Sequence, residues 1–240
     1  MNGWAFSKRI LQIFFAVTCL QVVSDRQTGF ADSSKSVAMQ QPATETPIAQ
    51  QPVQPPSPAP APQEVKRAEI VIYGFEKGLE GWRIPDWAKN SNDYVARDVT
   101  VSKNYAKEGS HSLEVPVEFP GGRWTGAYVE REVEVNDWSP FGRLSVEIFL
   151  PQDAPQGLKA KIILSVGEQW KWIEMNHAVR LEPGAWMTIN VNLKPGSMDW
   201  KFFPDEAFRK RVYRLGVRVE SDKEPVYSGS VFIDNICMAE

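Results

Sequence analysis

Hydrophobic and polar residues alternate with a period of two along most of the chain after residue 67. Side chains alternate across a pleated strand, so this pattern is typical of β-strands with one buried face. Clear examples are residues 113–119, 144–150 and 158–166, and turns rich in Gly and Pro separate such runs. The pattern predicts an all-β fold, an antiparallel β-sandwich over residues 68–240, with one short helix near residues 205–210.

One predicted strand carries an unusual set of side chains. Trp170, Trp172 and Glu174 fall on one of its faces, and Ile173 and Met175 fall on the other. The two aliphatic residues can serve the core, which leaves two tryptophans and a carboxylate facing outward. Aromatic rings stack on the apolar faces of sugar rings, and neighbouring polar groups can hydrogen-bond to the hydroxyls. The three outward residues are therefore candidates for ligand binding, with packing in the core as the alternative for the tryptophans.

Residues 1–31 have the organisation of a secretory signal peptide, with a basic start, an apolar run over residues 10–23 and small residues before the cleavage position. The apolar run is short and interrupted by polar residues, so it is a poor membrane span. We expect a secreted or periplasmic protein. The alternatives are an uncleaved anchor and lipidation, since Ala16–Cys19 resembles a lipobox with an unsuitable Thr18. In either alternative, contact with a membrane is made only through the N-terminus.

Residues 32–67 show no periodicity and consist largely of Ser, Ala, Thr, Gln and Pro, including QQPVQPPSPAPAPQ at residues 50–63. Such a composition cannot bury enough apolar area to offset the entropy lost on ordering. It predicts a disordered Pro/Gln-rich linker, locally stiffened by its prolines. We interpret this linker as a tether for the folded domain.

The composition argues against several classes of function. A net charge of -3 is too small to favour nucleic acid as a partner. The two cysteines, Cys19 and Cys237, lie near opposite ends of the chain, which excludes a disulfide framework and a Cys-based zinc site. His111 and His177 belong to no recognised catalytic motif. We therefore expect a protein that is not an enzyme.

Four short motifs follow one another along the predicted sandwich: YGFEKGLEGW at residues 73–82, AKEGSHSL at 106–113, PGAW at 183–186 and GSVFIDNI at 229–236. In order and spacing they resemble the galactose-binding-like jelly rolls used as carbohydrate-binding modules. The resemblance covers about residues 70–238. It implies a jelly-roll β-sandwich and, as partner, a polysaccharide or oligosaccharide, although this fold hosts many functions.

The resemblance also implies a structural calcium ion where the first and last strands meet. Glu76 and Asp234 match by position and would supply carboxylate oxygens, and backbone carbonyls near Gly109 and His111 would complete the shell. Calcium takes six to eight oxygen ligands, so two carboxylates, carbonyls and water are enough for a modest site. The alternative is that Asp234 caps a turn and Glu76 is solvated.

Three further residues are candidates for ligand contacts. Trp124 lies in a GGRWTG loop just before a predicted strand. Glu147 and Arg218 face outward on their strands and would contact the ligand if those strands share a sheet with Trp172. Among the other tryptophans we assign Trp82 and Trp186 to packing, because they lie within the fold motifs; Trp87, Trp138 and Trp200 are placed in loops.

The predicted function is non-catalytic carbohydrate binding by an aromatic sheet face. The alternative is an envelope or extracellular assembly module whose exposed tryptophans dock a protein partner. A third hypothesis is a small glycan-active enzyme, since a glycosidase needs only two facing carboxylates.

Overall fold

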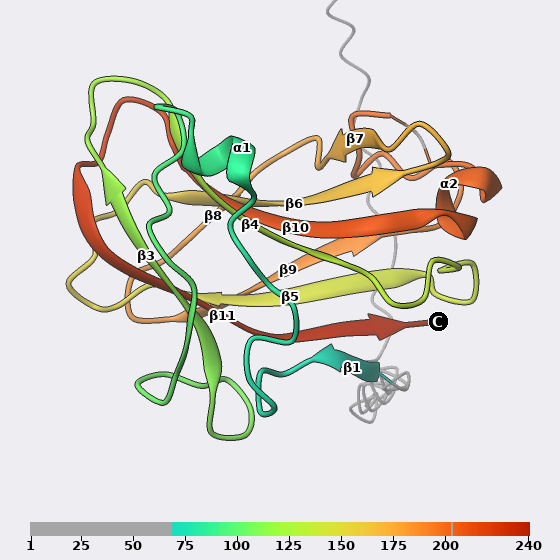
Figure 1. Ribbon diagram of the computed structural model, residues 1–240, viewed down its shortest axis with the longest axis horizontal. Helices are drawn as coiled ribbons and strands as arrows, with labels where there is room; N and C mark the ends of the chain where they lie inside the picture. The colour runs from blue at the N-terminus through green and yellow to red at the C-terminus, as the bar shows by residue number, and fades with distance from the viewer. Residues whose placement is uncertain (1–68, 203) are drawn as a thin grey trace, which may run out of the picture. The chain divides into compact units, whose positions relative to one another are not determined.

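The computed structural model describes residues 69–202 and 204–240, which form two antiparallel sheets that lie one above the other (Figure 1). The six-stranded sheet has the order β2-β3-β11-β5-β9, and β1 also pairs with β11. The five-stranded sheet has the order β4-β10-β6-β7, and β8 also pairs with β6. The strands are β1 (Glu69–Tyr73), β2 (Thr100–Ser102), β3 (Ser112–Phe119), β4 (Thr125–Glu132), β5 (Arg143–Phe149), β6 (Lys159–Val166), β7 (Lys171–Glu174), β8 (Val179–Arg180), β9 (Trp186–Asn192), β10 (Val212–Ser221) and β11 (Tyr227–Ala239).

The core lies between the sheets and is built by the inward half of each alternating pattern. Leu144, Val146 and Ile148 of β5 face Ile162 and Leu164 of β6, and all five are fully buried. This confirms the predicted all-β antiparallel sandwich. Three tryptophans, Trp82, Trp138 and Trp200, are buried in the same core.

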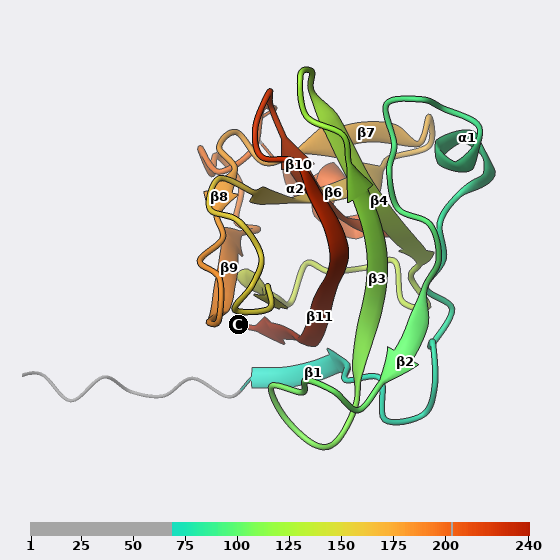
Figure 2. The same ribbon diagram turned by 90° about the vertical axis from the view of Figure 1, so that its left-hand side faces the viewer.

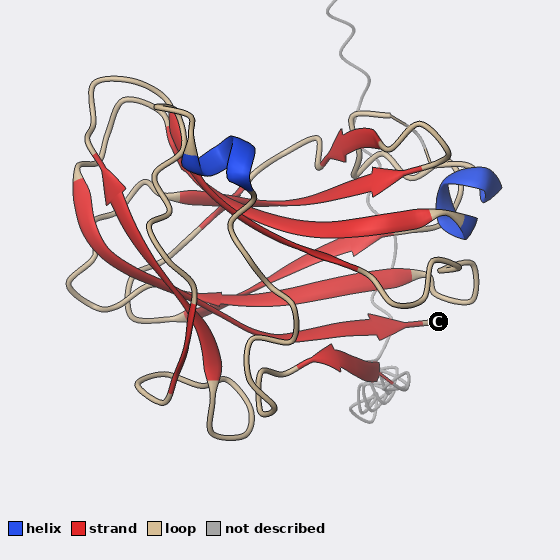
Figure 3. Ribbon diagram, viewed as in Figure 1, coloured by secondary structure: helices blue, strands red, loops and turns tan. Residues whose placement is uncertain are grey.

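Within the described residues, helix is confined to two short segments at the periphery (Figure 3), α1 (Asp86–Lys89) and α2 (Glu206–Lys210). The predicted helix is α2, where the Asp205 side chain accepts a hydrogen bond from the backbone N–H of Phe208 at 2.6 Å and caps the N-terminus. The expectation of a single helix was wrong, because α1 has four residues and is too short to show a helical period. Trp87 therefore lies in a helix and not in a loop.

The segment between α1 and β2 runs along one edge of the sandwich (Figure 2) and joins the two sheets. The backbone N–H of Val95 donates to the carbonyl of Gly126 in β4 at 2.9 Å, and the N–H of Glu118 in β3 donates to the carbonyl of Val95 at 3.1 Å. The segment is consequently part of the hydrogen-bonded scaffold.

The predicted signal peptide and linker, residues 1–67, lie outside the described residues, so both stay predictions. Within residues 69–202 and 204–240, no helix is long and apolar enough to cross a membrane.

Removing a core side chain should destabilise the sandwich far more than removing the same side chain from an exposed strand position. Ile162→Ala, at a fully buried position, is expected to lower the free energy of unfolding by about 3 kcal/mol through lost burial and a residual cavity. Ile70→Ala is the matched control, because Ile70 is 55% exposed and should change stability by less than about 0.5 kcal/mol. Urea denaturation measures both; equal effects would contradict this core.

Candidate ligand-binding site

The outer face of the five-stranded sheet gathers aromatic and charged side chains from all four of its long strands. Strand pairing places Arg218 of β10 between Tyr128 of β4 and Lys161 of β6, and Trp172 of β7 opposite Ser165 of β6. These side chains face away from the core because their neighbours in sequence face into it. The outward residues include Tyr128, Glu130, Lys161, Ser165, Trp172, Glu174, Arg214, Gly216 and Arg218.

Five rings on this side form a connected cluster, which we call the aromatic face: Trp87, Tyr94, Trp124, Tyr128 and Trp172. Tyr128 is its buried floor, with ring centroids 5.1 Å from Trp172 and 5.3 Å from Trp87. Trp87 also meets Tyr94 edge-on at 4.9 Å, and Tyr94 meets Trp124 edge-on at 6.0 Å. Trp87 keeps 43% of its surface exposed, so the cluster presents aromatic surface to a ligand.

The connection from Arg83 to Val95, which contains α1 and carries Trp87, is fixed to β4 at both ends, and we call this whole connection the Trp87 loop. At one end the backbones of Arg83 and Glu130 exchange two hydrogen bonds of 2.9 Å. At the other end the N–H of Val95 donates to the carbonyl of Gly126. The indole of Trp87 is thus held over the sheet by a loop whose ends cannot move independently of it.

Two glycines make room for the flat arrangement of these side chains. A Cβ atom at Gly216 would lie 2.3 Å from the hydroxyl of Tyr128, so only glycine lets that ring lie across β10. A Cβ atom at Gly126 would lie 3.0 Å from Cδ of Arg218 and 3.3 Å from the Trp124 ring. The Tyr128 hydroxyl then donates to Glu130 at 3.1 Å.

Trp170 does not lie on the strand where the alternating pattern placed it. It ends the turn before β7, with φ at 52°, and its N–H donates to the carbonyl of Gly167 at 3.0 Å. Its ring stacks on Tyr213 at 4.7 Å, and the Arg214 guanidinium lies 4.9 Å from its centroid. The ring is fixed by these contacts while 46% of the residue stays exposed.

Trp170 and Trp172 line one cavity of about 370 Å³. Its volume is within the range of small-molecule sites, which is roughly 300–1,000 Å³. The lining residues are Trp87, Tyr94, Ser165, Trp170, Trp172 and Arg214. The prediction that Ile173 and Met175 serve the core is confirmed, since both are buried.

Glu174 is the centre of a charged network beside the cavity. Its Oε2 atom lies 3.0 Å from Arg218 Nη2, 3.0 Å from Lys201 Nζ and 3.6 Å from Lys161 Nζ, and its Oε1 atom accepts from Trp172 Nε1 at 3.3 Å. Burial raises the pKa of Glu174, but the hydrogen bonds from Arg218 and Lys201 outweigh it and lower that pKa to about 2. The carboxylate is therefore ionised at neutral pH.

Arg218 is almost fully buried and is held by carboxylates on two sides. Its Nε atom donates to Glu220 at 2.9 Å, and its Nη2 atom donates to Glu174. Burial lowers the pKa of Arg218, yet the hydrogen bond to Glu174 and the charge of Glu220 more than offset this and raise it. The guanidinium also lies 5.4 Å from the Trp124 ring centroid, which ties this loop tryptophan to the network.

The structure does not bring Glu147 to this face. Glu147 belongs to β5 in the six-stranded sheet, where it accepts from the Thr188 hydroxyl at 2.6 Å and pairs with Lys107 at 3.5 Å. Its proposed contact beside Trp172 is therefore corrected: alternation fixes whether a side chain faces the core but not which sheet its strand joins. Trp186 lies in that same sheet, half-buried and packed against Phe149 at 5.4 Å.

Sequence reasoning missed two members of the aromatic face. Tyr128 could have been found, because it alternates with the inward Ala127 and Val129. Tyr94 lies in a segment without periodicity, so its position could not be predicted. Trp87 was recognised as a loop tryptophan, but the sequence did not place it over the sheet.

The two predicted calcium ligands lie near each other and hold one loop, residues 105–111. Glu76 Oε1 accepts the backbone N–H groups of Ser110 and His111, each at 2.8 Å, and its Oε2 contacts His111 Nδ1 at 3.0 Å. The buried Asp234 accepts the N–H groups of Lys107 at 2.7 Å and Glu108 at 3.2 Å. The two carboxylates fasten the loop to β11 and to the turn after β1.

This donor set fits a calcium ion poorly. Calcium needs oxygen ligands, whereas the loop directs N–H groups at these carboxylates. Among the described residues, no group of three or more His, Cys, Asp and Glu side chains could hold a metal ion. The calcium site stays a prediction.

Comparisons with known proteins match this fold. The family model described as "mannanase, galactose-binding domain-like" matches residues 73–235, which is more than half of the chain. A search of curated proteins found no match.

Two solved structures share the fold at low identity. One is the module CBM27-1 of Caldicellulosiruptor saccharolyticus in complex with mannohexaose, with 18% identity, a TM-score of 0.50 and coverage of 72% of this chain and 97% of that one. Another is CBM28, a carbohydrate-binding module specific for non-crystalline cellulose, with 14% identity, a TM-score of 0.52 and coverage of 71% and 94%. At these identities the likeness shows the fold alone.

Replacing Glu174 should destabilise the protein in a pH-dependent way. Because folding lowers the pKa of Glu174 to about 2, its ionised form stabilises the folded state above the unfolded pKa near 4.5, and this is lost as pH falls through about 2. Glu174→Gln is expected to cost about 2 kcal/mol at pH 7 and almost nothing at the acid end. Urea denaturation of both proteins between pH 7 and pH 2 measures the difference; a constant difference would contradict the role of this charge.

Asp234→Ala should destabilise the protein by about 3 kcal/mol, because the fully buried Asp234 carboxylate accepts the backbone N–H groups of Lys107 and Glu108, and both hydrogen bonds would be lost. Asp234→Asn is the control that keeps one acceptor oxygen and should cost less. Thermal melting with and without a chelator distinguishes the two possible roles of the Asp234 carboxylate, hydrogen bonding to the loop and binding of calcium. Loss of stability on chelation in the wild type would support calcium, whereas an unchanged midpoint would remove it.

Proposed function

This chain belongs to the mannanase galactose-binding-like domain family, and from that membership we propose that it binds polysaccharide on its aromatic face without cleaving it. The observation that supports this most directly is the cavity shared by Trp170 and Trp172, next to the Glu174 and Arg218 network. It combines aromatic surface with fixed hydrogen-bonding groups, which is the chemistry that a sugar ring requires.

Binding would proceed by stacking and hydrogen bonding. Sugar rings lie with their apolar faces on Trp172 and Trp170, and Trp87, whose ring is edge-on to Trp172 at 5.7 Å, lines the same cavity. The Glu174 carboxylate accepts hydrogen bonds from sugar hydroxyls, and the cationic groups of Arg218 and Lys161 donate to others. Because ion pairs already hold these groups in place, little side-chain entropy is lost when the ligand binds.

We propose a mannan or glucan as the ligand, with mannan first. The family is named for mannanases, and a solved structure with this fold holds mannohexaose. The site mixes both charge signs, because Glu174 and Glu220 pair with Arg218, Lys161 and Lys201, and groups that both donate and accept hydrogen bonds suit a neutral sugar chain. A secreted or periplasmic location is part of the proposal, since it is where such polysaccharides are met.

Trp172→Ala should weaken binding to mannohexaose by about 30-fold, equivalent to about 2 kcal/mol, because the largest outward ring of β7 is lost. Isothermal titration calorimetry of the full chain measures this affinity. Trp186→Ala is the matched control: this tryptophan is also half-buried on a strand but lies in the other sheet, so binding should not change.

Three outcomes would contradict the proposal. Binding that survives Trp172→Ala unchanged would exclude the aromatic face as the site. No binding to mannan, cellulose or xylan, together with capture of a specific protein partner that depends on Trp172, would favour the assembly module. Release of reducing sugar that depends on one carboxylate would show an enzyme.

A further inference from the structure

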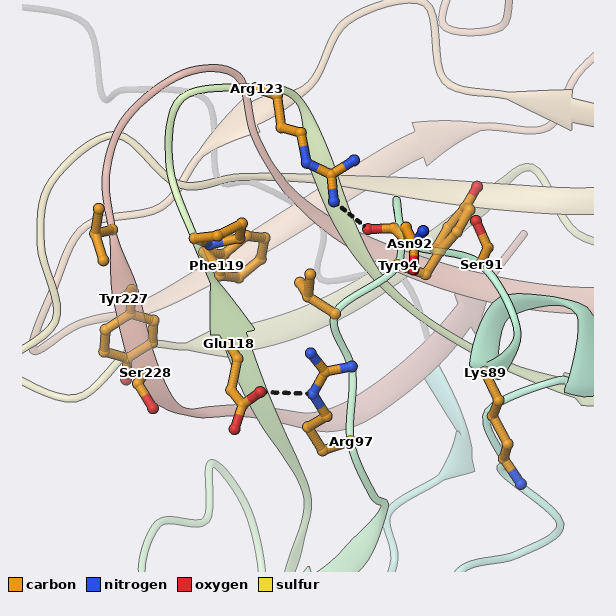
Figure 4. A pocket seen from close by; sticks show the side chains of 13 residues that line it. Lys89, Ser91, Asn92, Tyr94, Arg97, Glu118, Phe119, Arg123, Tyr227 and Ser228 are labelled. Carbon is orange, nitrogen blue, oxygen red and sulfur yellow. Dashed lines mark hydrogen bonds and ion pairs between the residues drawn. The ribbon is translucent and has the colours of Figure 1, made fainter.

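A second groove, which we call the edge groove, lies beside the aromatic face along the segment that joins the two sheets (Figure 4). Its volume is about 650 Å³. Tyr94 lines both this groove and the cavity of the aromatic face, so the two hollows are neighbours. The other lining residues that matter here are Arg97, Glu118, Arg123, Tyr227 and Ser228.

The walls of the edge groove belong to the rigid scaffold. On one side, the N–H of Arg97 donates to the carbonyl of Pro116 at 2.9 Å, and the N–H of Glu118 donates to the carbonyl of Val95. On the other side, Tyr227 begins β11 and its hydroxyl donates to the carbonyl of Ser230 at 3.0 Å. A ligand would therefore meet side chains that are already positioned.

The polar groups of the groove are planar and paired. Arg97 Nε lies 2.8 Å from a Glu118 carboxylate oxygen, and Arg123 Nη1 lies 2.6 Å from Asp93 Oδ1 (Figure 4 shows the first pair and Arg123 reaching toward Asn92). Within the described part of the chain, no residue hydrogen-bonds to the terminal Nη1 and Nη2 atoms of Arg97. Those two nitrogens remain as donors for a ligand.

This charge pattern favours a neutral ligand over an anion. Each arginine of the groove already has a carboxylate partner, so neither provides an uncompensated positive charge. Paired arginine and carboxylate groups suit adjacent hydroxyls, which need both donors and acceptors. The rings of Tyr94 and Tyr227 add aromatic surface.

We propose that the edge groove extends the glycan site, so that a polysaccharide chain crosses the aromatic face, passes Tyr94 and continues between Arg97 and Tyr227. This inference rests on the proposed function. Its consequence is a preference for long chains, because short oligosaccharides occupy the aromatic face alone.

The test is the double variant Arg97→Ala/Glu118→Ala, which removes both partners and leaves no unpaired charge. Both side chains are more than half exposed, so the fold should not change. The matched control is Arg143→Ala/Glu69→Ala, an exposed ion pair that joins β5 to β1. Calorimetric titrations use mannotriose, mannohexaose and a soluble linear mannan.

The double variant is expected to bind mannotriose like the wild type and to bind the linear mannan about tenfold more weakly, with mannohexaose between them. The control variant should match the wild type with all three. An equal loss at every length, or no loss at any length, overturns the extension. If Trp172→Ala still weakens binding to mannohexaose, the proposed function stands without the extension. A wild-type protein that binds none of these mannan probes, and neither cellulose nor xylan, overturns both.

Discussion

The register of β10 is the constraint on which both the core and the site depend. This strand pairs with β4 on one side and β6 on the other, and its residues from Arg214 to Glu220 alternate between the two faces. Leu215 and Val217 face the core, while Gly216 and Arg218 face outward. A slip of one residue would turn Arg218 into the apolar core and turn two aliphatic side chains outward. The burial of the core therefore also fixes the position of the guanidinium that organises the site.

A second constraint is electrostatic. Arg218 is almost fully removed from water, and an isolated buried charge would cost several kcal/mol. Glu174 on β7 and Glu220 on the same strand compensate it, and Glu174 in turn needs Lys161 and Lys201. The network joins three strands and holds each polar group in one orientation. The same contacts that offset the cost of burial thus prepare the groups that a ligand would meet.

Much of the fold follows from sequence, because alternation is a local property. It predicted the longer strands but not the short β2 and β8, and it predicted the inward Ile173 and Met175 and the outward Trp172 and Glu174. It failed for Glu147. The alternating pattern shows only that a residue faces away from the core, whereas the sheet to which its strand belongs is decided by pairing with strands distant in sequence. It also failed for Trp170, whose turn conformation takes it off the strand. The positions of these two residues depend on tertiary structure.

The Trp87 loop has two structural roles: it covers the edge of β4, and it holds Trp87 over the sheet. Strand β4 is the edge of the five-stranded sheet, and an uncovered edge exposes hydrogen-bonding groups that invite aggregation. Arg83 and Val95 cover this edge by pairing with Glu130 and Gly126. Between these two points the chain must bulge outward, and the bulge is the loop that holds Trp87 over the sheet. The same backbone contacts therefore protect the edge of β4 and complete the aromatic face. A change that frees either end of the loop should expose the edge and displace Trp87.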